Sequence, residues 1–449
     1  MIVRLNMVLP YDTPALDAYW MPSRDGGIHR LGPMPAPWEK VRGGTIKTTT
    51  LTDKQRINRL WSREWKALKS DKQFTSAVET DVRPVVIENL TVSDTHLAVN
   101  GKWLVTGPSG ARLLGTTGRA AKKARGQAAA VKELNAFFTQ ARQQSTELPL
   151  WEDDIAGLDF VIEARNLKNY FHFVRETFSV FALIADLKGF TGRIIIVAKD
   201  RDVPAFVLAH IAAIFPELRD KVDIRQAPAT FERAIIAHYS DTSYFYQPEA
   251  KIEGLIPENQ PLAKDEVGTN LVKLIILNSY SRSLRKLREA AHKRIEDQWF
   301  DHLPERFWVS RRSTPGHDRT IENEDEIIAL LEPYGFKKIY FEDYAPLTQV
   351  GIMRDADIMI SYHGAGFTNM LYAGTQARII ELGTLQTARL RMDDFTGFAN
   401  ASQSDYTVAV ADFPDEFGDV VPPMRGAGIY PVRMSDAAVE RLIALVKTL

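Results

Sequence analysis

A short run rich in small residues, HGAGFTN at positions 363–369, has the residue types of an anion-binding loop. It follows the apolar, strand-like stretch 356–361 and precedes a helix-like segment. This order leaves backbone N–H groups without partners at the positive end of the helix dipole. The glycines let a ligand approach the backbone because no Cβ stands in the way. We therefore expect the run to bind a phosphate, with its polar side chains at the rim. The residues assigned to this site are His363, Gly364, Ala365, Gly366, Thr368 and Asn369.

The same run has a simpler interpretation. A tight strand-to-helix turn, in which His363 only satisfies local hydrogen bonds, would also have this sequence. As a dinucleotide-binding fingerprint the run is weak, because Asn369 stands where the third glycine of G-x-G-x-x-G belongs.

A second group of candidate anion ligands follows another strand-like stretch. Ser310, Arg311 and Arg312 come directly after it, and Arg319 lies in the loop beyond. Guanidinium groups bind phosphate oxygens in a bidentate fork, although arginines in loops are usually solvated. Ligands of parallel sheets lie at the carboxyl ends of the strands. We therefore expect Ser310 and at least one of these arginines, with Arg311 ranked first, to lie near the 363–369 run.

A candidate general base lies in the first half of the chain. His172 and Glu176 are four residues apart, so on a helix they share one face. An imidazole held by a carboxylate is a competent base near neutral pH. The aromatic residues around them fit equally well a core helix whose histidine is buried and hydrogen-bonded.

Alternating strand and helix patterns must position these residues. In the last two thirds of the chain, apolar strand-like runs alternate with helical patterns, which predicts α/β structure with parallel sheets and helices on both faces. We expect an irregular, β-containing N-terminal extension at 1–150, an α/β half at 151–265 and a second at 270–449. A polar, proline-bearing stretch near 247–270 is the expected connection between the halves.

Composition narrows the possible functions. The chain has 449 residues, a formal net charge of -1 and no cysteine. Its length predicts two or three domains, and the missing cysteines exclude disulfides, thiolate nucleophiles and cysteine-based zinc sites. The balanced charge argues against nucleic acid as the main partner. No histidines have metal-ligand spacing, and Asp355 and Asp357 suit a structural role, so we predict no metal site.

Signals for export or membrane insertion are not evident. The first ten residues lack the apolar core of a signal peptide, and no window approaches the ~18 consecutive apolar residues of a membrane helix. We therefore expect a cytoplasmic protein. The basic stretch 112–142 fits a solvated helix face, or else an electrostatic footing for an anionic acceptor or a membrane surface. The second interpretation would place the protein peripherally at the inner face of the membrane.

Taken together, these motifs resemble glycosyltransferase family 61. The resemblance rests on Asn169-Tyr-Phe-His172, on Val309-Ser-Arg311 and above all on the 363–369 run followed by Ile380-Glu381-Leu382. That family includes bacterial capsular-polysaccharide enzymes of the DUF563 type, plant xylosyl- and arabinosyltransferases, and animal O-linked N-acetylglucosaminyltransferases.

The resemblance implies a GT-B-like fold, in which two Rossmann-like parallel-sheet domains face a cleft. It implies inverting, metal-independent transfer of a sugar from a nucleotide sugar, which we expect to be a UDP-sugar, to a hydroxyl of a glycan or glycolipid in cell-surface polysaccharide biosynthesis. No other cofactor is expected. The resemblance assigns Arg311 and the His363 loop to the donor diphosphate, Glu381 to the donor site and His172 to the base. Glu176 is then its orienting partner or an alternative base. A dinucleotide-dependent oxidoreductase and a catalytically inactive sugar-binding relative remain the alternatives.

Overall fold

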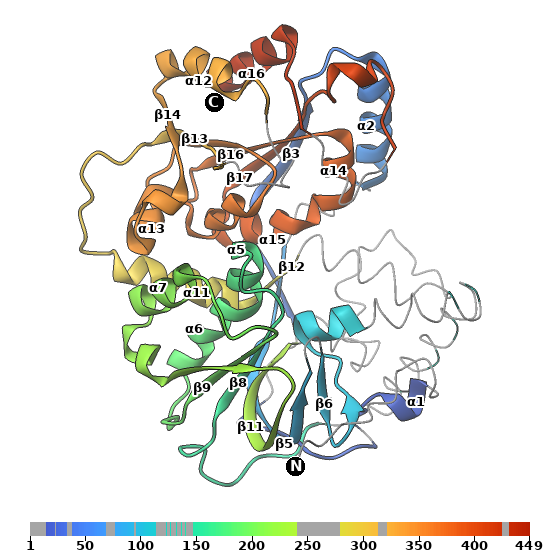
Figure 1. Cartoon of the computed structure of the whole chain (residues 1–449), viewed down its shortest axis with the longest axis vertical. Coiled ribbons are helices and arrows are strands. Elements are labelled where there is room, and N and C mark those ends of the chain that lie inside the picture. Colours follow the sequence, from blue (N-terminus) through green and yellow to red (C-terminus); the bar gives the residue numbers. More distant parts are fainter. Residues whose placement is uncertain are drawn as a thin grey trace. The chain divides into compact units, whose positions relative to one another are not determined.

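The structure of the chain is a computed structural model in which two compact units are distinguished (Figure 1). It describes residues 15–22, 24–33, 38–68, 77–93, 96–113, 123, 126, 132, 136, 140, 147–239, 279–312, 321–423 and 431–449. Unit 1 comprises residues 1–40, 79–275 and 281–287, and unit 2 comprises residues 41–78, 276–280 and 288–449. Both units combine helices with parallel strands, so the predicted α/β class is confirmed at that level.

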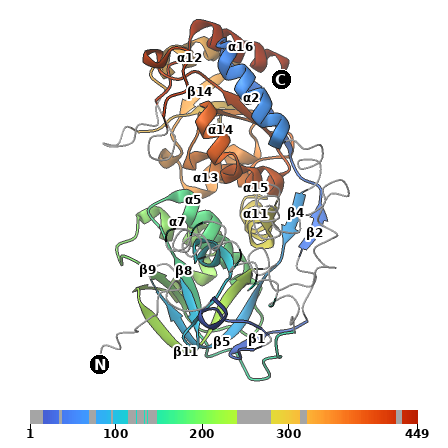
Figure 2. The ribbon, with the colours of Figure 1, turned by 90° about the vertical axis from the view of Figure 1, so that its right-hand side faces the viewer.

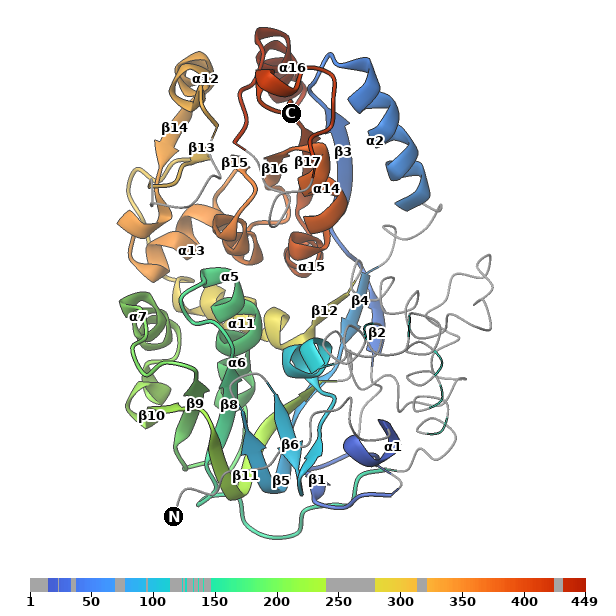
Figure 3. The ribbon, with the colours of Figure 1, turned by 45° about the vertical axis from the view of Figure 1, so that its right-hand side comes forward.

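Six parallel strands form the sheet of unit 2, in the order β14-β13-β15-β16-β17-β3 (Figure 3). The register pairs Trp308 of β13 with Ile360 of β15, and Ile360 with Ile380 of β16. The central strands β13, β15 and β16 are mostly apolar because parallel strands are covered on both faces. Their bounds are β3 (Thr45–Thr50), β13 (Arg306–Val309), β14 (Phe336–Ile339), β15 (Ile358–Tyr362), β16 (Arg378–Gly383) and β17 (Asp405–Val410).

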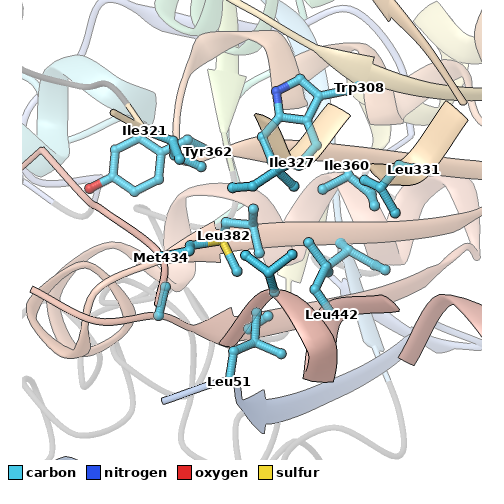
Figure 4. Close-up of a cluster of buried hydrophobic side chains, with 14 of the residues drawn as sticks. Leu51, Trp308, Ile321, Ile327, Leu331, Ile360, Tyr362, Leu382, Met434 and Leu442 are labelled. Atoms are coloured by element: carbon cyan, nitrogen blue, oxygen red, sulfur yellow. The ribbon is translucent and has the colours of Figure 1, made fainter. Parts of the chain in front are cut away.

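Two helices, α12 (Glu324–Leu331) and α16 (Asp436–Thr448), contribute to a buried cluster on this sheet. Figure 4 shows Ile327 of α12 and Leu442 of α16 among Trp308, Ile360 and Leu382 from three strands. All five side chains are fully buried, and burial of each stabilises the fold by about 1.5–3 kcal/mol. This packing fixes the strands whose carboxyl ends carry the predicted anion ligands.

The remaining helices of unit 2 include α2, which lies alongside α14 (Figure 2). Their bounds are α2 (Gln55–Leu68), α13 (Pro346–Arg354), α14 (Leu385–Arg391) and α15 (Asp393–Ser402). The described part of this unit also contains the 3₁₀ helices η4 (Glu332–Tyr334), η5 (Phe341–Asp343), η6 (Ala365–Tyr372) and η7 (Asp415–Phe417).

Unit 1 contains a mixed sheet in the order β10-β9-β8-β11-β5-β6-β7, with β1 paired to β5. Strands β8 to β11 run parallel, whereas β5 is antiparallel to β11 and to β6. The strands are β1 (Ile28–Arg30), β5 (Val82–Val92), β6 (Leu97–Val99), β7 (Lys102–Trp103), β8 (Phe160–Ala164), β9 (Ile194–Ala198), β10 (Val222–Gln226) and β11 (Ala229–Tyr239). The helices are α1 (Ala15–Ala18), α5 (Tyr170–His172), α6 (Ser179–Ala185), α7 (Ala205–Ile214), the π-helical η1 (Phe173–Phe178) and the 3₁₀ helix η2 (Pro216–Lys221).

The segment predicted as an N-terminal extension, 1–150, contributes to both sheets. Strand β3 pairs in parallel with β17 of unit 2, and β1, β5, β6 and β7 belong to the sheet of unit 1. Among the described residues, the chain passes between the units within β2 (Trp38–Val41), β4 (Ala77–Thr80), β12 (Ser279–Ser281) and α11 (Arg282–Arg294).

Two predicted segments cannot be compared with the structure. The predicted connection at 247–270 and most of the basic stretch 112–142 lie outside the described residues. Across the residues that are described, none of the helices is both long and apolar enough to span a bilayer.

Candidate functional site

The sheet of unit 2 has a topological switch point between β13 and β15. From β13 the chain moves to one neighbour, β14, and then returns to pair β15 on the other side. Ligands of parallel α/β sheets bind at the carboxyl ends of the strands flanking such a point. Arg311 follows β13 and His363 follows β15, so the structure brings together the two groups that the sequence predicted to meet. A hydrogen bond of 2.7 Å from Ser361 Oγ to the Val309 carbonyl joins the two strand ends.

Arg311 and Gly364 are in close contact at this switch point. A Cβ atom built on Gly364 would overlap the guanidinium group of Arg311. Gly364 has φ 166° and ψ 178°, an extended backbone that any residue adopts. Glycine is therefore needed here for the close approach of Arg311 and not for its backbone conformation.

His363 belongs to a buried chain of hydrogen bonds with Glu381 and Tyr406. His363 Nδ1 lies 2.8 Å from Glu381 Oε1, and the hydroxyl of Tyr406 donates to Glu381 Oε2. His363 directly follows β15, Glu381 lies in β16 and Tyr406 lies in β17, and these three strands are adjacent in the sheet. All three residues are buried. The other ring nitrogen, His363 Nε2, lies 3.7 Å from Asp394 Oδ2, which also pairs with Arg391. The orientation of His363 is thus fixed by its surroundings.

The start of η6 forms the rest of the loop. The 3₁₀ helix begins at Ala365, and Phe367 N donates to the Gly364 carbonyl at 3.0 Å. Thr368 and Asn369 are fully buried, so their side chains are not at the rim where the sequence placed them. Asn369 Nδ2 donates to Gln349 Oε1 of α13, at 3.1 Å, which ties η6 to that helix. The side chain of Asn369 thus serves internal hydrogen bonding that no local sequence pattern reveals.

The other residues predicted beside Arg311 have different surroundings. Ser310 Oγ donates to Glu324 Oε2 at 2.5 Å and is buried. Arg312 is paired with Asp343 and lies 5.1 Å from the ring centroid of Tyr340. Arg319 lies outside the described residues. Arg311 is therefore the arginine that the described part of this loop places against the 363–369 run.

A charged cluster in unit 1 contains the candidate base. Helix α5 continues directly into η1, and Asn169 Oδ1 caps the start by accepting from Phe171 N at 3.0 Å. His172 Nδ1 lies 2.7 Å from Glu176 Oε1, as the four-residue spacing predicts, while Nε2 lies 3.3 Å from Arg165 Nη2. Single π-helical turns of this kind are frequent at functional sites.

Two residues that the sequence did not single out complete this cluster. Arg112 Nη2 lies 2.5 Å from Glu163 Oε1, and Arg112 Nη1 lies 3.6 Å from Glu176 Oε2. Burial raises the pKa of Glu163 to about 7, against the opposing charge of Arg112. Burial acts in the same direction on Glu176, but the hydrogen bond from His172 and the charges of Arg112 and Arg165 outweigh it and lower its pKa. The one local signal was a single acidic residue in an otherwise apolar strand, FVIEA.

A metal site in the described part of the chain would need several ligand side chains close together. There, no group of three or more histidine, aspartate or glutamate side chains is placed to hold an ion.

Comparisons with known proteins agree with the resemblance. Residues 170–380 match the family model described as Glycosyltransferase 61. A stretch of 78 residues is 39% identical to the EGF domain-specific O-linked N-acetylglucosamine transferase of Drosophila melanogaster. That match covers 17% of this chain and 14% of the relative, so the chain is comparable with only a small part of that protein. The family match includes His172, Arg311 and the 363–369 run. This chain therefore contains a domain of the glycosyltransferase 61 family at residues 170–380.

Proposed function

We propose that this protein is an inverting, metal-independent glycosyltransferase. It would move a sugar from a nucleotide-sugar donor, of the UDP type, to a hydroxyl of a glycan or glycolipid acceptor. The family domain at 170–380 supports glycosyl transfer as the reaction class. The wider proposal is a GT-B enzyme of cell-surface polysaccharide biosynthesis, such as capsule synthesis, working in the cytoplasm at the inner face of the membrane.

One observation carries the assignment of donor binding to unit 2. The guanidinium of Arg311 lies against Gly364 at the switch point of a parallel sheet, beside the first residues of η6. A cation, a close backbone approach and a helix start favour a phosphorylated ligand when they occur together. In the proposal, Arg311 and the backbone of residues 364–366 contact the diphosphate, while His363 is a donor-side ligand oriented by Glu381.

The proposed reaction is one in-line displacement. The acceptor oxygen attacks the anomeric carbon, the bond from that carbon to the diphosphate oxygen breaks, and the diphosphate leaves with the electron pair. Negative charge grows on the leaving group as this bond breaks, and Arg311 would stabilise it. Loss of one such donor typically costs about 3–4 kcal/mol of barrier.

His172 is the proposed base for the acceptor hydroxyl. Its Nδ1 faces Glu176, so a neutral ring with the proton on Nδ1 leaves Nε2 to take the proton from the acceptor. Nε2 lies 3.3 Å from Arg165, whose side chain is exposed, and an acceptor hydroxyl would replace this contact.

Donor binding is the direct test. Thermal-shift titrations with UDP, CMP and their sugar conjugates would be run on the wild-type chain, on Arg311→Ala and on Arg312→Ala. Arg312 is a matched control because it is the adjacent arginine, is exposed and is paired with Asp343. We expect Arg311→Ala to weaken nucleotide binding by about 10- to 100-fold, the equivalent of a charge-assisted hydrogen bond, and Arg312→Ala to leave it within about 2-fold.

Each alternative gives a different result in the same titrations. Absence of stabilisation by any nucleotide would contradict the proposal, and stabilisation by NAD alone would favour an oxidoreductase. Nucleotide binding without transfer to a broad panel of glycan acceptors would favour an inactive sugar-binding relative.

A further inference from the structure

Arg112 and Glu163 lie outside the segment that matches the family model. Arg112 contacts Glu176 of the His172–Glu176 pair, and Glu163 contacts Arg112. We propose that they are positioning residues, in which Arg112 bridges Glu163 to Glu176 and thereby fixes the carboxylate that holds His172. The proposal deepens the role assigned to His172 and rests on it only for its kinetic consequence.

The geometry places one nitrogen group beside each oxygen of Glu176. Oε1 lies 2.7 Å from His172 Nδ1, and Oε2 lies 3.6 Å from Arg112 Nη1. The second nitrogen of the same guanidinium, Nη2, lies 2.5 Å from Glu163 Oε1. A planar guanidinium can hold two carboxylates in fixed relative positions in this way, which the point charge of a lysine cannot do. Rotation of the Glu176 carboxylate is therefore restrained at both ends.

Three separate segments supply this bridge, so it is a tertiary feature and not a local helix contact. Arg112 comes from a helical turn at residues 107–113, Glu163 from β8 and Glu176 from η1. The side chains of Glu163 and Glu176 are only 7% and 9% exposed. Burying two carboxylates is costly, and it is tolerated here because a guanidinium is placed between them. An apolar residue at position 163 would avoid the desolvation cost of a carboxylate in a strand that is otherwise apolar.

Both carboxylates also border a small, partly open pocket. Its volume is about 30 Å³, and its polar lining consists of Glu163, Glu176, Thr106, Ser109 and Tyr239. That volume is enough to hold a water molecule among polar partners. A water molecule in this pocket would be able to exchange a proton with Glu163 even though that side chain is buried.

Proton exchange at Glu163 would change how Arg112 acts on Glu176. The charged groups that face Glu163 are Arg112, Arg165 and Glu176, and burial raises the pKa of Glu163 to about 7. Below that pH Glu163 is neutral, and the charge of Arg112 acts on Glu176 alone. Above it, two carboxylates share one guanidinium. The environment of His172 should consequently change with the protonation of Glu163.

Carboxyl and imidazole NMR of the full chain tests this without any assay of activity. In protein labelled at glutamate side-chain carboxyls, we expect one signal to titrate near pH 7 and to be missing from Glu163→Gln. The His172 ring signals, assigned by their loss in His172→Gln, should shift with the same midpoint. In Glu163→Gln the shift of the His172 signals near pH 7 should disappear. Glu88→Gln is a matched control because Glu88 lies 3.4 Å from His29 in the same unit, outside the cluster.

Two results would overturn the proposal. One is a Glu163 carboxyl that titrates with the bulk of the glutamates, and the other is a His172 signal that is identical in wild type and Glu163→Gln. Where the chain is active, Arg112→Met should lower kcat by about 10-fold or more with the donor KM within about 2-fold, as expected when the base and not donor binding is disturbed. A chain without transferase activity would refute the proposed function while the NMR result still decides the bridge. If Arg112→Met does not fold, the Glu163→Gln spectra decide the question, because glutamine has nearly the shape of glutamate.

Discussion

The guanidinium group of Arg311 occupies the space that a Cβ atom on Gly364 would fill. Because the backbone of Gly364 is extended, at φ 166°, alanine can adopt it without strain. A substitution at this position therefore reports on the steric overlap alone. Few glycines allow this separation of the two effects, since many are required for a positive φ.

The first prediction is that Gly364→Ala displaces Arg311. Nucleotide binding should fall by about 10-fold or more, close to the loss in Arg311→Ala, because both variants remove the same cation from the site. The double variant Gly364→Ala/Arg311→Ala should bind like Arg311→Ala alone, since the overlap is relieved once the long side chain is gone. Calorimetric titration of all three variants makes this comparison. Additive losses would mean that Gly364 acts independently of Arg311.

The second prediction concerns the hydrogen bond from Tyr406 to Glu381. Both residues are buried, so Tyr406→Phe leaves a carboxylate oxygen without its donor and should cost about 1–3 kcal/mol of unfolding free energy. Donor binding should also weaken, because Glu381 orients His363.

Tyr372 provides the matched control for Tyr406. Its hydroxyl is buried and has no hydrogen-bond partner among the described side chains and backbone. Urea titrations of both variants measure the unfolding free energy, and Tyr372→Phe should be neutral or stabilising because an unsatisfied polar group is removed. Equal destabilisation by the two variants would show that loss of a buried hydroxyl, and not of the Glu381 bond, is what matters.

The third prediction assigns His172 to the chemical step. His172→Gln should lower kcat by about 10²–10⁴-fold, the usual contribution of a general base, with little change in the donor KM. The control is His29→Gln in the same unit, where the histidine pairs with Glu88 at 3.4 Å outside the cluster. Steady-state kinetics with saturating acceptor separate the two constants. A rise in donor KM at constant kcat would contradict the role of general base and assign His172 to donor binding instead.

The meeting of Arg311 and His363 was predictable because both follow apolar strands in an alternating pattern. Carboxyl ends of parallel strands lie at one edge, so the motif order alone places the two residues near each other. The contact between His172 and Glu176 followed from helical spacing in the same way.

Other features depend on pairings that are distant in sequence. Strand β3 reads TIKTTT, which lacks the apolar run typical of a buried parallel strand, and its place in the sheet depends on pairing with β17, more than 350 positions later in the chain. Tyr406 and Arg112 reach Glu381 and Glu176 through tertiary packing, and neither has a local pattern that marks it.

The last prediction is a dependence of stability on pH that arises at His238. This residue lies on β11 opposite Arg83 of β5, and burial, together with the charge of Arg83, lowers its pKa to about 4. In the unfolded chain a histidine titrates near 6.5, so between these values the unfolded state binds more protons. The contribution of His238 is therefore fully present above pH 6.5 and is lost as the pH falls toward 4.

Between pH 7 and pH 5 this linkage should cost the wild-type chain about 2 kcal/mol of unfolding free energy. Urea titrations at the two pH values measure it, and His238→Gln should lose about that much less than wild type on acidification. The same substitution at the exposed His302 serves as the control for removal of a histidine. An unchanged pH dependence in His238→Gln would mean that this histidine is protonated in the native state, with its charge stabilised despite the neighbouring arginine.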